Sequence, residues 1–592
     1  MSVDLRKFAR KNDLAFAATF IAALLFAVML TQQRYVEVWR TGAFFDTDDA
    51  MRAVELRDFL AGQGWFDLTA RRLDPPTGVT MHWSRLIDVA LAAIQEPLSL
   101  FLTPQQAERG MRLLFPFTLL SALLLLSGRL GGLLAGAPAR LLAIFLVMLS
   151  APMIEQFSPG RIDHHAPQIV IAMASFILLL QGLDRRRAVS LGAVAALMAL
   201  SLAISLENIP LFAPMAGALL WLFITDGVAA RAQLLWFAGG ALVAFPLFFI
   251  TTVAPSAYTQ SACDAFSAPW LAGAIAGAVG LMALALAASG LATARARAPA
   301  GVAVAVMVLA VFAGIAPACL SGPFSGLDPL VQDLWLSHVQ EVMPLSALFE
   351  QTPSKGVALT APVALGLAAA FWRARETEGL ERRRWSVAAA TIAVGLTASL
   401  LHIRVFSSVT PLAMAALAGG VSIIVFRLRV SAALRNTLAV FLSLFLSPIG
   451  LTLALADDQA GPPQTEIDCL TPEALGPLSA LPPGRVAASF NLGAHILAHT
   501  PHEALAAPYH RNNHGNRLAA EIFFAAPERA GALTRAAGAT LVAWCARGRS
   551  PLVAAAPDGL AAMLARGEVP AWLERRSTPD APLLVFAVRS VE

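Results

Sequence analysis

Residues 185–208 read RRRAVSLGAVAALMALSLAISLEN. Three arginines precede nineteen residues without a charge (188–206), and Glu207 and Asn208 follow directly. Because an α-helix rises about 1.5 Å per residue, the uncharged block is long enough to cross a hydrocarbon core of about 30 Å. The stretch therefore predicts a membrane-spanning helix with a basic end on one side and a polar turn on the other.

The composition of the whole chain agrees with this interpretation. The 592 residues are 57% hydrophobic and only 14% charged, with a mean hydropathy of +0.66, whereas soluble domains contain about 25% charged residues. The net charge of +4 is small, and no basic stripe with interleaved aromatic residues is present, so a nucleic-acid partner has no support. The sequence predicts a polytopic α-helical membrane protein.

Similar apolar blocks recur along the chain and predict thirteen spans. The first follows Arg6, Lys7, Arg10 and Lys11; no small-residue cleavage site comes after it, which favours a retained helix over a signal peptide. The expected spans are 14–31, 111–127, 141–153, 167–183, 188–206, 209–224, 234–253, 268–292, 301–319, 356–372, 386–402, 409–426 and 437–456.

The distribution of basic residues predicts the orientation of these spans. With a cytoplasmic N-terminus, the cytoplasmic segments hold twenty basic residues, and the short loops opposite hold only Arg161, Lys355 and Arg404. The long loop 32–110 is left out, because long loops cross the membrane largely regardless of charge. An odd number of spans then places the C-terminal region outside. We expect a bacterial inner (plasma) membrane protein with a periplasmic C-terminal domain.

Four cysteines fall in or beside the segments expected to face outward, where disulfides persist. Cys263 with Cys319, and Cys469 with Cys545, are the natural pairs. Sequence spacing alone does not fix connectivity, and four unpaired thiols are the alternative.

The predicted organisation is a transmembrane domain, residues 1–456, followed by a C-terminal exported domain, residues 457–592. The membrane domain carries a large first outer loop, 32–110, in which Met51, Val54 and Leu60 follow a helical period, and a second outer loop, 320–355. In the C-terminal part, short strands are expected at 485–490, 539–545 and 583–588, with helical stretches between them, which predicts a small α/β domain.

The segment FFDTDDAMR (44–52) places Asp46, Asp48 and Asp49 close to the membrane surface. Three carboxylates within four residues repel one another unless a cation or hydrogen-bond donors neutralise them. Oxygen-rich sites of this kind suit hard divalent cations that also bind substrate phosphates. Capping of a helix start explains one or two of these aspartates equally well.

The hairpin PGRIDHHAPQ (159–168) holds Asp163, His164 and His165 at the same membrane boundary. A carboxylate and an imidazole two residues apart can ligate one cation from an extended turn. Simple hydration of polar residues at the boundary is the alternative.

Further polar residues lie at the predicted outer ends of other spans. Glu207 either anchors a helix end or points into a cavity, and Glu341 lies in the second outer loop with His338. Arg404 stands against the positive-inside bias, which suggests an anionic partner such as phosphate; snorkelling to lipid headgroups is the alternative.

The C-terminal part contains five of the ten histidines within twenty residues (495–514). His495 and His499 have the i, i+4 spacing that permits a zinc site on one helix face. No cysteine or acidic cluster completes such a site, so a polar loop facing a cavity or an acceptor is the favoured interpretation.

These features together resemble the catalytic subunit of oligosaccharyltransferases, a GT-C class membrane glycosyltransferase. The layout of residues 1–456 is similar, and Asp46 to Arg52 keeps the spacing of that family's D-P-Y-x-x-x-R type motif. Asp163 to His165 is similar to its D-x-H motif. Glu341 corresponds to its loop glutamate, although His338 stands where the family has Thr or Ser. Arg404 corresponds to an arginine that contacts the donor pyrophosphate. The family's W-W-D-Y-G motif has no counterpart in 457–592, which puts recognition of a peptide sequon in doubt.

The resemblance implies an outward-facing glycosyltransferase that moves a sugar or oligosaccharide from a polyprenyl-phosphate or -pyrophosphate donor to a saccharide, lipid or protein acceptor. It implies that Asp46, Asp163 and His165 bind a divalent cation, Mn²⁺ or Mg²⁺, and that Arg404 and His338 lie at the donor phosphate. Asp48 or Glu341 would be the general base. The alternatives are a lipid-linked saccharide flippase or transporter, and a membrane scaffold without catalytic activity.

Overall fold

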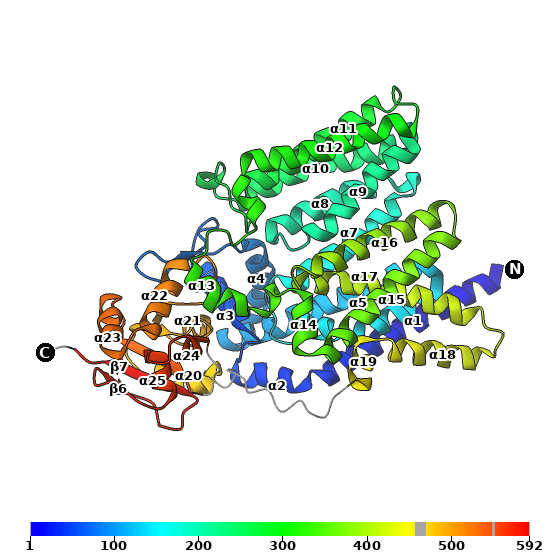
Figure 1. Ribbon diagram of the computed structural model, residues 1–592. Coiled ribbons are helices and arrows are strands. Elements are labelled where there is room, and N and C mark those ends of the chain that lie inside the picture. Colours follow the sequence, from blue (N-terminus) through cyan, green and yellow to red (C-terminus); the bar gives the residue numbers. More distant parts are fainter. Residues whose placement is uncertain (1, 456–468, 547–550, 591–592) are drawn as a thin grey trace.

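A computed structural model describes residues 2–455, 469–546 and 551–590 (Figure 1). Up to residue 455 its longer helices are α1 (Ser2–Leu30), α2 (Gln32–Thr41), α3 (Thr47–Leu60), α4 (Arg85–Ser99), α5 (Pro104–Met148), α6 (Ala151–Gln156), α7 (His165–Gly182), α8 (Ser190–Ile204), α9 (Ile209–Asp226), α10 (Arg231–Thr252), α11 (Ala268–Ala287), α12 (Ala294–Ile315), α13 (Pro329–Leu334), α14 (Leu345–Gln351), α15 (Pro353–Glu376), α16 (Gly379–Ser399), α17 (Arg404–Phe426), α18 (Ala432–Phe445) and α19 (Pro448–Ala454). A short hairpin, β1 (Thr69–Ala70) and β2 (Val79–Thr80), lies in the first outer loop.

The chain is a multi-pass α-helical membrane protein. Among the described residues, eight helical segments are long and apolar enough to cross a membrane, or nine if the bent pair α18–α19 forms one span. Two of these eight are composite, since α9 and α10 count as one segment and α5 is interrupted at Ala135 and Gly136. The 15-residue α8 is apolar but shorter. Within the described residues, each of the thirteen predicted spans overlaps a helix.

The interruption in α5 is a reversal of direction. Gly136 has φ = +80°, a conformation that glycine adopts without steric cost. The two arms then lie so close that a Cβ added to Gly131 would meet the carbonyl oxygen of Ala139 at 2.5 Å. The reversal accounts for two predicted spans, 111–127 and 141–153, within the segment Pro104–Met148.

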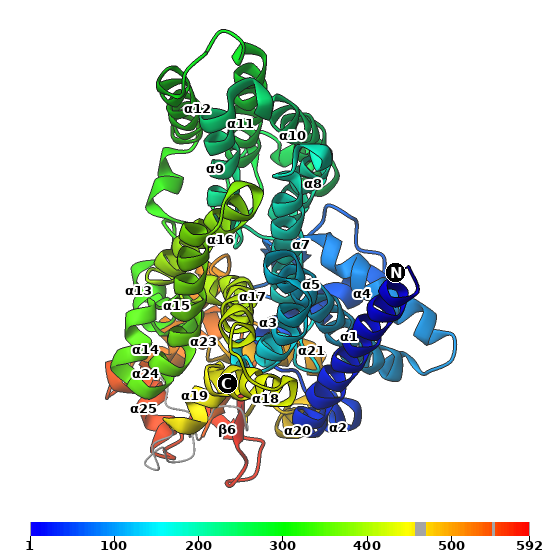
Figure 2. The ribbon, with the colours of Figure 1, turned by 90° about the vertical axis from the view of Figure 1, so that its right-hand side faces the viewer.

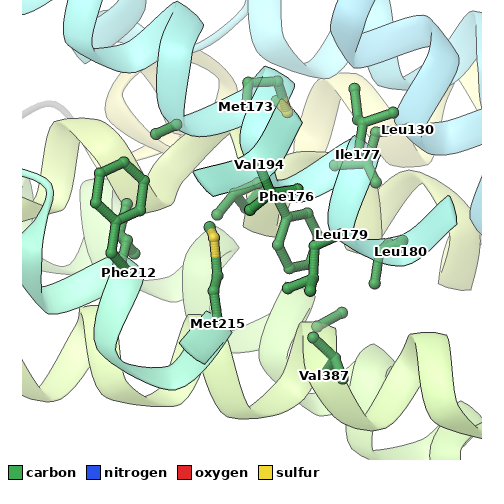
Figure 3. Packing of buried hydrophobic residues seen from close by; sticks show 14 of the residues in the cluster. Leu130, Met173, Phe176, Ile177, Leu179, Leu180, Val194, Phe212, Met215 and Val387 are labelled. Carbon is green, nitrogen blue, oxygen red and sulfur yellow. The ribbon is translucent and has the colours of Figure 1, made fainter. Parts of the chain in front are cut away.

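Apolar side chains from several helices form the core of the bundle (Figure 3). Phe176 and Leu179 of α7 pack with Met215 of α9 and Val387 of α16, and all four are buried. Packing of this kind fixes the positions of the helix ends, which is where the polar residues lie.

The outer segments gather at one end of the bundle (Figures 1 and 2). Helix α3 contacts both α4 and the C-terminal helix α21 (Leu492–His499). Met51 and Val54 are buried as predicted, but Leu60 is 38% exposed. The expected single apolar stripe is therefore wrong: residues from Asp49 to Leu56 are buried on every face, because α3 is covered on two sides, and its last turn projects beyond that cover.

The C-terminal region contains a five-stranded sheet in the order β4-β3-β5-β7-β6. β3 is parallel to both β4 and β5, whereas β7 is antiparallel to β5 and β6. The three predicted strands correspond to β3, β5 and β7, and the expected helices lie between them. The proposed boundary at 456/457 falls at the edge of 456–468, outside the described residues. The elements are α20 (Pro472–Ser479), β3 (Arg485–Ala488), α21, β4 (Glu503–Ala504), α22 (Asn513–Phe524), α23 (Pro527–Ala536), β5 (Leu541–Cys545), α24 (Pro551–Ala555), α25 (Leu560–Ala565), β6 (Leu573–Arg575) and β7 (Leu583–Val588).

The first outer loop is joined to this sheet through its backbone. Leu73 forms a parallel bridge with Ala504, and the amide of Asp74 donates to the Ala504 carbonyl at 2.8 Å. The Tyr509 hydroxyl donates to the carbonyl of Thr47, at the start of α3, over 2.8 Å. The C-terminal region therefore holds the segment that carries the first acidic cluster.

Both predicted disulfides are present. Cys263 pairs with Cys319 and links the chain after α10 to the chain after α12, and Cys469 pairs with Cys545 of β5. No free cysteine remains in the described chain.

Candidate active site

A cavity of about 600 Å³ lies where the bundle meets the outer segments. One part of its wall is polar, with Asp46, Asp48, His164, Glu207, Glu341 and Arg404. Another part is apolar and largely aromatic, with Trp270, Phe324, Trp335, Leu336 and Phe490. The cavity thus offers charged groups and a non-polar surface to the same ligand.

Four helices begin at the polar wall. Asp46 is the N-cap of α3, His164 is the N-cap of α7, and α9 and α17 begin at Ile209 and Arg404. Free backbone N–H groups and the helix dipole make a helix N-terminus favourable for an anion. Several such ends around one cavity favour a phosphate or another anionic group there.

The first acidic cluster is arranged around one arginine. The Arg161 guanidinium forms ion pairs with Asp46 and Asp163, and its Nε lies 4.0 Å from Asp49 Oδ2. Asp46 Oδ1 accepts the amides of Asp48 and Asp49 at 2.9 and 3.2 Å. The capping alternative is therefore correct for Asp46, but its second oxygen serves the ion pair.

Asp49 joins the two segments of the cluster. Its Oδ1 accepts the backbone amides of Ile162 and Asp163 at 2.6 and 3.2 Å, while its Oδ2 is buried without a hydrogen-bond partner in the described structure. Burial, with the charge of Asp46, raises the pKa of the Asp49 carboxyl well above its usual range. Burial also raises the pKa of Asp163, but Arg161 and the two histidines outweigh it and the net shift is downward.

A second charged network lies beside the first. Glu207 contacts His164 Nε2 and His165 Nδ1, each at 3.0 Å, and Arg404 Nη1 at 3.1 Å. Arg404 also forms an ion pair with Glu341, and His165 Nε2 lies 3.8 Å from Glu341 Oε1. Burial alone would raise the pKa of Glu207, but the charges of His165, His164 and Arg404 have the larger effect and hold this pKa well below its usual range. The Glu207 carboxylate is therefore ionised. Glu207 also lines the cavity, in agreement with the second of its two expected roles.

Asp48 and Glu341 face the same cavity in opposite electrostatic environments. Burial, with the charges of Asp46 and Glu341, raises the pKa of the Asp48 carboxyl to about 8. Burial also raises the pKa of Glu341, but Arg404 and His165 outweigh it and bring the pKa to about 2. A proton acceptor that operates near neutral pH needs a pKa in that region, which favours Asp48 over Glu341.

The carboxylates fit a hard divalent cation. Asp46, Asp49 and Asp163 each offer one oxygen, and these atoms lie within 4.8 Å of one another. Arg161 brings a single positive charge to these three carboxyl groups, and oxygen ligands suit Mg²⁺ or Mn²⁺. Of the predicted ligands, Asp46 and Asp163 are thus together with Asp49, whereas the His165 side chain belongs to a separate group with His164 and Glu207.

Other residues from the sequence analysis lie elsewhere. His338 is exposed in the cavity wall. His495 and His499 pack against Phe44, and no acidic residue groups with them as a metal site in the described chain.

Two residues of the site were not singled out as site residues from the sequence. Arg161 was noted only as an outward-facing charge, yet it lies among three carboxylates; its place two residues before Asp163 was the available signal. Tyr509, whose hydroxyl bonds Thr47, lines the cavity and carried no motif.

Comparisons with known proteins give a match in fold but none in sequence. No family model and no curated protein matches the sequence. The fold is similar to that of the oligosaccharyltransferase AglB from Archaeoglobus fulgidus in complex with an inhibitory peptide and a dolichol-phosphate, with a TM-score of 0.66 and 14% identity over 89% of this chain and 69% of that chain.

Two further structures of the Archaeoglobus fulgidus oligosaccharyltransferase agree. The form with Zn and sulfate has a TM-score of 0.63 and 15% identity over 96% of this chain and 73% of that chain. The form tethered to an acceptor peptide containing the NVT sequon has a TM-score of 0.63 and 16% identity over 97% and 74%. The fold resembles that of the oligosaccharyltransferase family, as the motifs and span layout predicted.

Proposed function

We propose that this chain is a membrane glycosyltransferase of the GT-C type, which transfers a sugar or oligosaccharide from a polyprenyl-phosphate or -pyrophosphate donor to an acceptor at the outer membrane face. The observation that carries the proposal is the cavity at the end of the bundle, where four helix N-termini and Arg404 meet a wall of carboxyl groups. Its position at the end of the spans lets a lipid tail remain among the helices while the phosphate enters the cavity.

In this proposal the acceptor loses a proton to Asp48 and attacks the anomeric carbon of the donor sugar. The bond between that carbon and the phosphate oxygen breaks, and the lipid phosphate leaves with the electron pair. Arg404 and the N-termini of α7, α9 and α17 stabilise the negative charge on the leaving group. Glu207 and Glu341 hold Arg404 in position through their ion pairs.

A divalent cation is part of the proposal. Asp46, Asp49 and Asp163 would hold Mn²⁺ or Mg²⁺, with Arg161 fixing the orientation of their carboxylates. When bound, the cation supplies positive charge for a leaving phosphate. The AglB structures include a dolichol-phosphate complex and a complex with Zn and sulfate, which supports a phosphate lipid and a cation for this fold without identifying the cation here.

A flippase or transporter for a lipid-linked saccharide is the second candidate. Such proteins place polar or broken helices near the middle of the membrane. The charged groups described above lie instead at one end of the helices, beside the proposed proton acceptor Asp48, which favours chemistry over transport.

The test is release of free polyprenyl phosphate or pyrophosphate by purified protein in liposomes given donor with a labelled lipid. We expect release with the wild-type protein and loss of release in Asp46→Ala and Asp163→Ala, with insertion into liposomes unchanged. EDTA should abolish release and Mn²⁺ should restore it. Movement of labelled donor between leaflets without release would indicate a flippase. Full release in EDTA would contradict the role of a divalent cation. Full release in both aspartate variants would contradict the catalytic assignment of Asp46 and Asp163.

A further inference from the structure

A third group of side chains that could bind a metal ion lies in the wall of the same cavity. His82, Asp264 and His510 each offer one ligand atom, and these atoms all lie within 4.8 Å of one another. His82 belongs to the first outer loop, Asp264 follows Cys263 in the loop between α10 and α11, and His510 precedes α22 in the C-terminal region. This group shares no residue with the carboxylates around Arg161.

The geometry brings the three side chains into direct contact. His510 Nε2 lies 2.6 Å from Asp264 Oδ2, and the ring centroids of His82 and His510 are 4.7 Å apart. Nδ1 of His82 is buried and has no hydrogen-bond partner in the described structure. A buried imidazole nitrogen without a partner is costly unless something binds it. A metal ion would satisfy it.

Arg511 fixes the orientation of the group. Its Nε and Nη2 donate to Asp264 Oδ2 and Oδ1 at 2.7 and 3.0 Å, and its Nη1 donates to the carbonyl of Met81 at 3.2 Å. A carboxylate oxygen has two acceptor positions, so Asp264 can accept from Arg511 and still ligate a metal. Partners of this kind hold metal ligands in place and are a usual part of metal sites.

From this arrangement we infer that His82, Asp264 and His510 bind a zinc-type transition-metal ion. Two imidazoles and one carboxylate suit Zn²⁺ far better than Mg²⁺, which prefers oxygen ligands. Three protein ligands leave a fourth position for water or a substrate oxygen on the cavity side. Such an ion joins three segments of the chain at the cavity wall and differs in metal preference from the Asp46, Asp49 and Asp163 group.

The first experiment measures bound zinc per chain. Purified full-length protein in detergent is dialysed against buffered ZnCl₂ and its zinc content is determined by mass spectrometry. His82→Ala and His510→Ala should each lose one Zn²⁺ per chain relative to wild type. Arg511→Gln should bind this ion about 10- to 100-fold more weakly. The matched control is His514→Ala, since His514 lies in the same segment but its side chain is 79% exposed and outside the group.

A second measurement needs no variant and is independent of folding defects. Diethyl pyrocarbonate modification of wild-type protein is mapped by mass spectrometry with and without ZnCl₂. Zinc should protect His82 and His510, and should leave His514 and the exposed His338 unprotected. Equal modification of His82 and His510 with and without zinc would overturn the site, as would unchanged zinc content in the folded His82→Ala and His510→Ala proteins.

Discussion

At the scale of single residues, the surroundings of two carboxyl groups in the cavity give them very different pKa values. Asp48 has a pKa raised to about 8, first by burial and then by Asp46 and Glu341, whereas the pKa of Glu341 is about 2. Since only ionised Asp48 can accept a proton, the transfer rate should rise about tenfold per pH unit below pH 8 and level off above it. Asp48→Asn should reduce the rate by about 10²- to 10⁴-fold. Initial rates of lipid phosphate release between about pH 6 and 9 measure both effects.

Glu341→Gln provides the control for this assignment. Glu341 is ionised throughout that pH range, and its negative charge helps to raise the pKa of Asp48. The variant should therefore keep the rise in rate but move its midpoint to lower pH. A flat profile in the wild type, or wild-type rates in Asp48→Asn, would contradict the role of Asp48.

Arg161 is the residue on which the first acidic cluster depends. Its side chain is 3% exposed and forms ion pairs with Asp46 and Asp163. Arg161→Gln leaves buried carboxylates uncompensated and should lower the free energy of unfolding by about 3–5 kcal/mol. Added Mn²⁺ should raise the melting temperature of the variant more than that of the wild type, because the cation replaces the lost charge. Thermal unfolding with and without Mn²⁺ measures this.

The control for Arg161 is a surface arginine. Arg71 is 71% exposed and, among the residues that the structure describes, pairs only with Asp67, so Arg71→Gln should change stability by at most about 1 kcal/mol and show no added response to Mn²⁺. Equal stability of Arg161→Gln and Arg71→Gln would contradict the charge-compensation argument.

At the scale of elements, the two disulfides hold the outer segments in place. Cys469–Cys545 closes a separation of 76 residues and fastens the chain before α20 to the central strand β5. Cys469→Ser should lower the stability of the sheet region by about 2–5 kcal/mol. The hydrogen-exchange rates of backbone amides should increase in β3, β5 and β7 and stay unchanged in α7 and α17. Non-reducing mass spectrometry of the wild type should find both disulfides, and four alkylatable thiols would contradict this prediction.

The helices and the strands β3, β5 and β7 could be predicted because each depends on a short, continuous stretch of sequence. Apolar blocks fix the helices, and the strands β3, β5 and β7 follow short hydrophobic runs. The gathering of Asp46, Asp163, His165 and Arg404 was predicted because each lies at the outer end of a predicted span. The role of Arg161 was not predicted, since its partner Asp46 is 115 residues away, and only the contact between the start of α3 and the hairpin before α7 brings them together. The exposure of Leu60 was missed for a similar reason, because burial depends on α4 and α21.

At the scale of the whole molecule, contacts between distant segments limit the topology. Tyr509 in the C-terminal region donates to Thr47 in the first outer loop, so both segments lie on the same side of the membrane. The chain between them must therefore cross the membrane an even number of times. The predicted spans from 111–127 to 437–456 number twelve, which satisfies this condition. Their helices form one bundle with the outer segments at a single end (Figures 1 and 2).

The distribution of basic residues predicts on which side of the membrane the outer segments lie. The ends of the helices away from the cavity carry the basic residues, such as Arg185, Arg186 and Arg187, and the positive-inside rule predicts that these ends face the cytoplasm. Alkaline phosphatase fused after Glu592 should therefore be active, and a green fluorescent protein fused there should be dark. The opposite pattern is expected for fusions after Arg187, which serve as the matched control. A dark phosphatase and a fluorescent fusion at Glu592 would place the cavity in the cytoplasm, and the acceptor would then have to be cytoplasmic as well.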